Sequence, residues 1–412
     1  MKKNFINEIT QRGFFYQCTD QNKLANLIDR KHIKAYIGFD CTAPSLHVGS
    51  LLQIMCLRLL QKYGHQPIVL LGGGTTLIGD PSGKDTTRKI LEENIIDKNI
   101  KKIKKIFEKL LDFQDKKTIP IFVNNAEWLN KLQYIEFLRD IGKHFTINKM
   151  LSFDSVKLRL QREQSLSYME FNYMILQAYD FYKLNKQHDC DLQIGGSDQW
   201  GNIISGVELI RKMNQKESFG LTTPLITVAS GAKMGKTENG AIWLDEELLS
   251  PYDYWQFWRN TNDSDVKKFL RYFTEINIEK LDEISKDKNI NNLKILLANE
   301  ATKLLHGEEK ANDAEKTAEE TFNDKGIGKN LPETFINKSQ FKNGINIIEL
   351  LYINKIMSSK SEIRRAINER GIKINDKLIV SEKIIIELKN FKENGCLKVS
   401  RGKKKHFIIR LK

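Results

Sequence analysis

The residues best suited to chemistry lie in the loops that directly follow predicted strands. His47 stands in the sequence HVGS, Asp198 in GGSDQW, and Lys233 and Lys236 in KMGKT. A helix N-terminus, an imidazole and ammonium groups all attract phosphate, and a carboxylate can accept hydrogen bonds from a ribose diol. These residue types predict a nucleotide site that stabilises negative charge as it develops on the phosphates.

A second polar group lies along the predicted helix 166–184. Tyr173, Gln177 and Asp180 recur at i, i+4 and i+7 on a helix that is otherwise rich in apolar residues. A phenol, an amide and a carboxylate on one stripe predict the wall of a polar pocket. The alternative is a stripe that faces solvent, and the apolar neighbours argue against it.

The elements that position these residues alternate between strand and helix, which predicts an α/β fold with a Rossmann-like parallel sheet and ligands at its carboxyl edge. Ser45 is the predicted N-cap of the helix after the first strand. Residues 126–165 are predicted to be a helical insertion. The predicted strands are 35–39, 66–71, 119–123, 191–194 and 225–228.

Several function classes are excluded by composition and spacing. The glycine-rich stretch 72–84 is one residue short of a Walker loop. The five cysteines form no CxxC pair, which argues against structural zinc and fits a reducing cytoplasm. No apolar run approaches ~18 residues, so no membrane span is expected. The N-terminus has no apolar core typical of a secretion signal.

Positive charge is concentrated near the end of the chain. The net charge is +14, and residues 345–412 hold 17 Lys and Arg against 7 Asp and Glu. Such a terminal block predicts a module that binds a polyanion. Residues 324–344, which are rich in Lys and Gly and have little periodicity, are predicted to be a linker.

The three loop motifs HVGS, GGSDQW and KMGKT, which follow one another in this order along the chain, resemble the signatures of class I aminoacyl-tRNA synthetases. The stretches GFDCTAPSLHVG, LIGDPSGK, YMILQAYDF and LQIGGSDQWGN narrow the resemblance to the bacterial-type tyrosyl-tRNA synthetases, over nearly the whole chain. Two positions depart from the family pattern. Ser50 replaces the second histidine of the HIGH-type signature, and KMGKT replaces the KMSKS-type sequence.

The resemblance implies a role for each matching residue. The residues that would bind tyrosine are Tyr36, Asp80, Tyr173, Gln177, Asp180 and Gln193. Those that would bind ATP and the adenylate are Gly38, Asp40, His47, Ser50, Gly196, Asp198, Gln199 and Lys236. Those that would assist pyrophosphate departure are Thr42, His47, Lys84, Arg88, Lys233, Lys236 and Thr237. Those that would contact RNA are Arg364, Arg365, Arg401, Lys403, Lys404 and Lys405.

The resemblance also implies the domains and partners. We expect ATP with Mg²⁺ as substrate, no tightly bound protein metal site, L-tyrosine and tRNA(Tyr) as further substrates, and a homodimer formed near residues 130–165. The expected domains are a catalytic domain at 1–229, the KMSKS-type loop with an α-helical domain at 230–323, the linker, and an S4-like RNA-binding domain at 345–412.

Two other functions stay open at this point. A synthetase of the same fold could charge tryptophan, although an indole pocket has no need of Tyr36 together with Asp180. A non-catalytic RNA-binding protein could use the C-terminal module alone, but it would have no use for His47, Lys233 and Lys236.

Overall fold

The computed structural model describes residues 4–82, 91–228, 231, 234–237, 240–322, 331–341, 344–392, 395–402 and 405–412. The chain divides into two compact units. The first comprises Met1–Leu249 and Gln256–Gly307, and the second comprises Ser250–Trp255 and Glu308–Lys412. No helix within the described residues combines the length and apolar character needed to cross a bilayer.

The first unit is built on a six-stranded sheet within the described residues, with the strand order β1-β6-β5-β2-β3-β4. All neighbouring strands run parallel except the short β1, which is antiparallel to β6. This confirms the predicted parallel sheet. The strands are β1 (Gln17–Cys18), β2 (Lys34–Asp40), β3 (Gln66–Gly72), β4 (Ile121–Asn124), β5 (Leu192–Gly196) and β6 (Phe219–Thr223).

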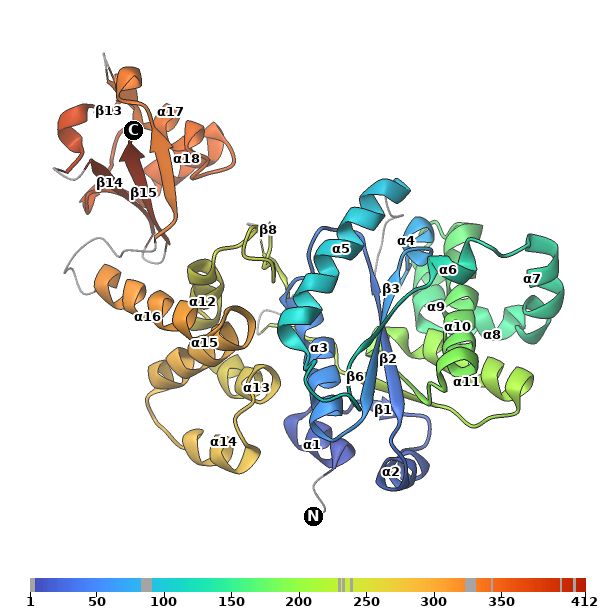
Figure 1. Ribbon diagram of the computed structural model, residues 1–412. Helices are drawn as coiled ribbons and strands as arrows, with labels where there is room; N and C mark the ends of the chain where they lie inside the picture. Colours follow the sequence, from blue (N-terminus) through green and yellow to red (C-terminus); the bar gives the residue numbers. More distant parts are fainter. Residues whose placement is uncertain are drawn as a thin grey trace. The chain divides into compact units, whose positions relative to one another are not determined.

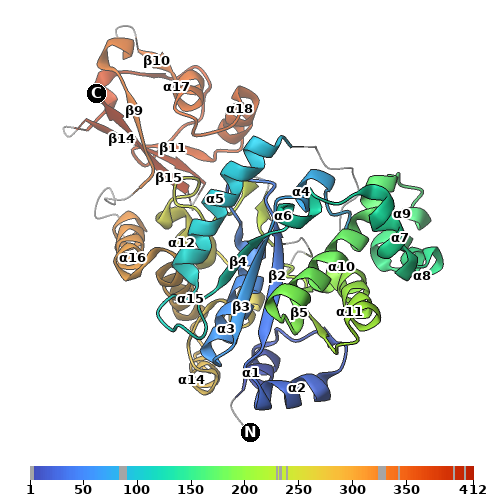
Figure 2. The ribbon, with the colours of Figure 1, turned by 45° about the vertical axis from the view of Figure 1, so that its right-hand side comes forward.

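Helices cover both faces of the sheet, with α3 and α5 on one side and α10 and α11 on the other (Figures 1 and 2). Alternating residues of β2 explain this layering, because successive side chains of a strand point to opposite faces. Tyr36 joins the cluster that contains Phe181 of α10, whereas the Phe39 ring lies 4.9 Å from that of Phe107 on α5. These helices are α3 (Val48–Lys62), α5 (Glu93–Leu110), α10 (Tyr168–His188) and α11 (Trp200–Asn214).

The remaining described helices lie before β2, in the glycine-rich stretch after β3, in the predicted insertion and after the third loop, and the last of them, α16, belongs to the second unit. The N-terminal pair is α1 (Phe5–Arg12) and α2 (Gln21–Arg30), and α4 (Thr75–Ile78) follows β3. The predicted insertion forms α6 (Ala126–Leu129), α7 (Tyr134–Asp140), η1 (Gly142–His144), α8 (Ile147–Ser152) and α9 (Asp154–Gln161). After the third loop come α12 (Pro251–Arg259), α13 (Asp263–Phe273), α14 (Ile278–Ile284), α15 (Ile290–His306) and α16 (Glu308–Phe322).

Two local predictions are wrong. The cap of α3 is His47, whose Nδ1 accepts a hydrogen bond from the Gly49 N–H, while the Ser45 hydroxyl donates to the Leu46 carbonyl. Residues 225–228 form no strand of the sheet, since β6 ends at Thr223. Pro224 follows directly, and a proline has no N–H with which to continue a ladder.

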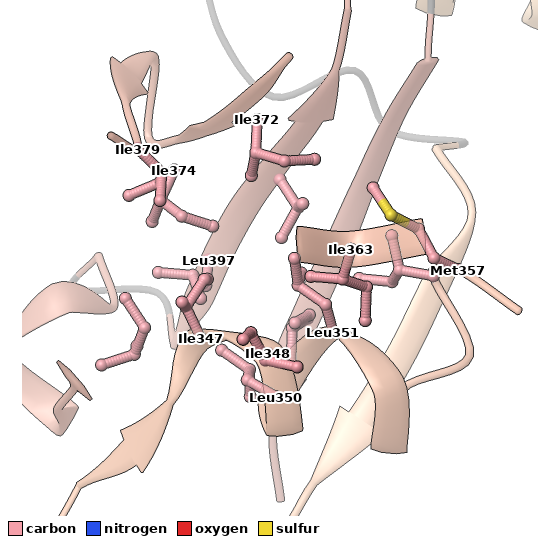
Figure 3. Close-up of a cluster of buried hydrophobic side chains, with 14 of the residues drawn as sticks. Ile347, Ile348, Leu350, Leu351, Met357, Ile363, Ile372, Ile374, Ile379 and Leu397 are labelled. Carbon is pink, nitrogen blue, oxygen red and sulfur yellow. The ribbon is translucent and has the colours of Figure 1, made fainter. Parts of the chain in front are cut away.

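In the second unit, the described residues form a five-stranded sheet in the order β12-β11-β14-β15-β9. Figure 3 shows its apolar core, in which Leu351 of α17 and Ile363 of α18 lie among side chains such as Leu397 of β14. The elements are β9 (Glu333–Ile336), η3 (Lys338–Phe341), β10 (Ile345–Asn346), α17 (Ile347–Ile353), α18 (Lys360–Asn368), β11 (Ile372–Ile374), β12 (Lys377–Leu378), β13 (Ile385–Ile386), η4 (Leu388–Asn390), β14 (Cys396–Arg401) and β15 (Lys405–Leu411).

The predicted linker 324–344 is therefore too long. Strand β9 pairs in parallel with β15, so Glu333–Ile336 belongs to the C-terminal sheet. This pairing joins segments more than seventy residues apart in sequence, and a four-residue strand has too little periodicity to be recognised locally.

Candidate active site

A cavity of about 310 Å³ opens at the carboxyl ends of β2, β3 and β5, the edge of the sheet where the predicted motifs meet. Its floor comes from the strands, and residues of α10, of α3 and of the turn η2 before α11 form its walls. Twelve of the predicted site residues line it: Tyr36, Gly38, Asp40, Ser50, Asp80, Tyr173, Gln177, Asp180, Gln193, Gly196, Asp198 and Gln199.

Two buried polar atoms beside this cavity have no hydrogen-bond partner among the described residues. They are the hydroxyl of Tyr36 and Oε1 of Gln193, whose side chains are 1% and 2% exposed. An unpartnered buried polar group costs about 1–3 kcal/mol. Both residues lie in the paired strands β2 and β5, facing each other in register. Their placement indicates that a polar ligand completes this end of the pocket.

Asp180 is 1% exposed and belongs to the same closed end of the pocket. Its two carboxylate oxygens accept hydrogen bonds from Asn125 Nδ2 at 2.9 Å and from Trp128 Nε1 at 2.7 Å. Burial raises the pKa of Asp180 to about 7, and these two donors oppose the rise. Asn125 and Trp128 are site residues that the sequence analysis missed.

A hydrogen-bonded chain connects Asp180 with the first loop. Asn125 Nδ2 donates to Thr75 Oγ1 at 3.0 Å, and the Thr75 hydroxyl donates to Asp40 Oδ1 at 3.1 Å. The Tyr173 hydroxyl reaches both carboxylate oxygens of Asp40 at 3.3 Å. The stripe predicted on α10 therefore faces the pocket, and Tyr173 and Asp180 lie at the two ends of this chain.

A second cluster of amides forms the opposite wall, where η2 (Ser197–Gln199) leads into α11. Gln199 Nε2 donates to Asp80 Oδ2 at 2.8 Å. Asn202 Nδ2 donates to Gln177 Oε1 at 3.0 Å and to Gln199 Oε1 at 3.2 Å. Asn202 thus connects two predicted site residues, Gln177 and Gln199. The sequence analysis did not predict Asn202, which lies in the first turn of α11.

His47 lies at the rim, between the first loop and the third. Its backbone forms a bridge with Trp243, and the Val48 N–H donates to the Ile242 carbonyl at 2.9 Å. A Cβ placed on Gly235 would lie 2.6 Å from His47 Nδ1, and Gly235 has a φ of +100°. Glycine is the residue that this conformation and this close approach favour, so the third loop can seat against the imidazole.

Other predicted residues fall outside this cavity or outside the described part. Thr42 is exposed and does not line the cavity. Lys84, Arg88, Lys233, Lys403 and Lys404 lie outside the described residues. The backbones of Lys236 and Thr237 form β7 (Lys236–Thr237), which pairs with β8 (Gly240–Ala241), but their side chains and that of Lys405 are not among those described.

The predicted RNA-binding arginines of the second unit differ in their surroundings. Arg365 is exposed on α18. Arg364 pairs with Glu382 at 3.5 Å, and Arg401 pairs with Glu362 at 2.7 Å. The half-buried Arg401–Glu362 pair connects β14 to α18, which gives Arg401 a structural contact within this unit.

Comparison with known proteins agrees with this geometry. The family described as "tRNA synthetases class I (W and Y)" matches residues 29–323, and the "Tyrosine--tRNA ligase SYY-like C-terminal domain" matches residues 324–409. A tyrosine--tRNA ligase of Pelagibacter ubique is 64% identical over 407 residues, covering 99% of both chains. One from Rickettsia massiliae is 51% identical over 409 residues, covering 99% of this chain and all of its own.

A solved structure supports the same relationship. The C-terminally truncated mitochondrial tyrosyl-tRNA synthetase of Aspergillus nidulans superposes with a TM-score of 0.69 at 30% identity, covering 78% of this chain and 95% of its own. The expected resemblance and class I fold are thereby confirmed. The chain has the parallel sheet and the three loop motifs of this family, and its relatives match it over their full length. It therefore belongs to the class I tyrosyl-tRNA synthetases of bacterial type.

Proposed function

We propose that this chain ligates L-tyrosine to tRNA(Tyr) in two steps, both at the cavity described above. In the first step a tyrosine carboxylate oxygen bonds to the α-phosphorus of ATP, and the bond to pyrophosphate breaks. In the second a terminal ribose hydroxyl of the tRNA attacks the carbonyl carbon of the adenylate, and AMP leaves. The observation that carries the proposal is the closed pocket end where the Tyr36 hydroxyl lies near Asp180.

Tyrosine-dependent exchange of labelled pyrophosphate into ATP tests this function. We expect exchange with L-tyrosine and none with L-tryptophan. Exchange with tryptophan instead, or with neither amino acid, would contradict the proposal.

The proposed tyrosine site follows from the contacts of its lining residues. The phenol hydroxyl lies between Tyr36 and Asp180, so that it donates to the carboxylate and satisfies the buried Tyr36 hydroxyl. Asp80, Tyr173 and Gln177 surround the amino acid's ammonium, and Gln193 lines the pocket beside Tyr36. The first three already belong to hydrogen-bonded networks that fix their rotamers, and such pre-organisation lowers the cost of binding.

The nucleotide is proposed to lie across the other part of the cavity, where Gly38 and Gly196 leave room for it beside the backbone. Asp198 accepts from the ribose, while Asp40, Ser50 and Gln199 line the adenylate. His47 supplies a donor to the departing pyrophosphate. Because its Nδ1 accepts from the Gly49 N–H, the neutral ring carries its proton on Nε2.

The remaining cations and the metal complete the proposal. Lys84, Arg88, Lys233 and Lys236 are proposed to neutralise charge on the phosphates, and the hydroxyls of Thr42 and Thr237 to donate hydrogen bonds to them. Among the described residues there is no cluster of three or more His, Cys, Asp or Glu. We therefore propose that Mg²⁺ arrives with ATP, held chiefly by phosphate oxygens and water. A cytoplasmic location is proposed because the five cysteines are free thiols.

The raised pKa of Asp180 predicts that tyrosine affinity depends on pH. A phenol donor stabilises the carboxylate and lowers its pKa in the complex, so binding releases a proton. Affinity must then increase with pH while the free carboxyl titrates near pH 7. We expect the Kd for tyrosine to be about tenfold lower at pH 8 than at pH 6. Calorimetry with tyrosine and phenylalanine measures this, and an equal pH dependence for both ligands would contradict it.

We propose that the insertion mediates a homodimer. Large apolar side chains are exposed along it, a composition typical of an interaction surface rather than a solvated face. They are Tyr134, Ile135, Leu138, Ile147, Leu151, Leu158 and Leu160.

A charge placed on this surface is expected to separate the subunits. The double variant Ile135→Glu/Ile147→Glu buries two unpaired carboxylates in a dimer but leaves them solvated in a monomer. Light scattering should then report the mass of one chain, against two for the unchanged protein. Val380→Glu, at a side chain 66% exposed in the second unit, is the matched control. Equal masses for all three proteins would contradict the proposal that the insertion forms the dimer interface.

The S4-like role of the C-terminal module is proposed from its charge. A chain that ends at residue 322 keeps every described residue of the cavity and loses the basic block, including Arg364 and Arg365. We expect normal pyrophosphate exchange but poor tRNA charging. Each lost phosphate contact lowers the log–log salt slope by about one unit, so the charging deficit should shrink at low ionic strength. Equal charging by both proteins across a salt series would exclude this role.

A further inference from the structure

The backbone of Cys41 is held by two buried side chains of other elements. Its N–H donates to Thr76 Oγ1 at 2.8 Å, and its carbonyl accepts from Asn99 Nδ2 at 2.8 Å. Cys41 is fully buried, and Thr76 and Asn99 are 4% and 5% exposed. Cys41 joins Asp40, whose carboxylate accepts hydrogen bonds from Thr75 and Tyr173, to Thr42 and the loop that leads to His47.

Asn99 departs from the pattern of its helix. The buried face of α5 is otherwise apolar, with Ile96, Ile103 and Phe107. An amide on such a face costs free energy unless it is hydrogen-bonded, and leucine would suit both the helix and its core better. The hydrogen bond from Asn99 Nδ2 to the Cys41 carbonyl offsets this cost.

The same helix also contacts the segment that follows the third loop. Lys102 pairs with Glu247 at 3.2 Å, and Lys109 pairs with Glu246 at 3.3 Å. That segment in turn bonds to the first loop, because the Leu244 N–H donates to the Leu46 carbonyl and the Asp245 N–H donates to Ser45 Oγ. Helix α5 therefore supports the loop that leads to His47 twice, directly at Cys41 and through the segment that bonds to Ser45 and Leu46.

We propose that Asn99 and Thr76 are positioning residues for adenylate formation, an inference that rests on the proposed function. By fixing both the N–H and the carbonyl of Cys41, they set the direction in which the chain leaves β2, and hence where Thr42 and His47 stand relative to the phosphates. Neither side chain lines the cavity. A small misplacement of reacting groups can lower a rate by about 100-fold.

The proposal predicts which kinetic quantity changes. Tyr36, Gln193 and Asp180 lie on β2, β5 and α10, within the sheet ladder and a long helix, and do not depend on the direction of the chain after Asp40. Losing the Cys41 contacts should therefore lower the rate of adenylate formation and weaken pyrophosphate binding, while the Kd for tyrosine stays unchanged.

The test compares Asn99→Leu and Thr76→Val with matched controls in full-length protein. Asn185→Leu removes a buried side-chain amide of the same kind, which donates a hydrogen bond to the Cys190 carbonyl at 2.9 Å and accepts one from Asn214 Nδ2 at 2.9 Å. Thr274→Val removes a buried hydroxyl that donates to the Leu270 carbonyl. We expect kcat for pyrophosphate exchange to fall about 10- to 100-fold in the first pair and less than about twofold in the controls, with Thr76→Ser restoring the rate.

A double-variant cycle supplies the second readout. If Asn99 acts through His47, the substitution Asn99→Leu should lower the rate of pyrophosphate exchange by a smaller factor in the His47→Ala variant than in the unchanged protein. The inference is overturned if the four variants lose activity in proportion to their lost stability, if tyrosine affinity falls together with kcat, or if the two costs are additive. Absence of exchange in the unchanged protein would instead contradict the proposed function.

Discussion

The variant His47→Ala is expected to form tyrosyl-adenylate about 100- to 1000-fold more slowly, with an unchanged Kd for tyrosine. The proton on Nε2 of His47 is placed to meet charge that develops on the leaving pyrophosphate. Losing one donor to such charge costs about 2.7–4 kcal/mol of transition-state stabilisation. Stopped-flow fluorescence of adenylate formation, with equilibrium dialysis for tyrosine, measures the two quantities separately.

A second variant distinguishes this role from capping, because His47 is also the N-cap of α3. In His47→Asn the amide oxygen can still accept from the start of the helix, since asparagine is among the best capping residues. It lacks a donor at the place of Nε2. We expect the Asn variant to regain stability but not rate. Recovery of the rate by asparagine would show that His47 acts by ordering the helix.

The other large effect is expected at Asp180. Asp180→Ala should lower kcat/KM for tyrosine and reduce the preference for tyrosine over phenylalanine about 10- to 100-fold. A hydrogen bond to a charged group contributes about 1.5–3 kcal/mol, and phenylalanine cannot make this bond in either protein. Discrimination against a substrate that leaves buried polar groups unpaired is established for this enzyme family.

Because Asp180 anchors the buried side chains of Asn125 and Trp128, the alanine variant also needs a control for folding. Trp128→Phe keeps an aromatic ring and removes one donor to the carboxylate, so it should change discrimination much less. Circular dichroism and thermal unfolding identify loss of structure. A folded Asp180→Ala protein with the original preference would mean that another residue recognises the phenol.

The parts of the site that could be predicted are those encoded over a short stretch. The turns after β2 and β5 carry their glycines and charged residues within a few positions, and the stripe with Tyr173 and Asp180 follows from helical spacing alone. The alternation of strands and helices was also sufficient for a parallel sheet. These features need no knowledge of which segments meet in space.

The missed residues are those whose role depends on a distant partner. Asn125 and Trp128 look like ordinary residues of a strand–helix junction until Asp180, more than fifty positions later, packs against them. Asn99 looks like an imperfection in an amphipathic helix. The cap of α3 was misassigned because Ser45 and His47 can both accept hydrogen bonds, and backbone geometry decides between them.

The pairing of β9 with β15 has a consequence for synthesis of the protein on the ribosome. Strand β9 is translated early in the C-terminal region, yet its only sheet neighbour among the described strands is β15, at the end of the chain. At about 5–20 residues per second, β9 waits roughly 4–16 s for that neighbour. This sheet can therefore close only after β15 has left the ribosome, and until then the nascent chain carries an unpaired strand edge that chaperones can bind.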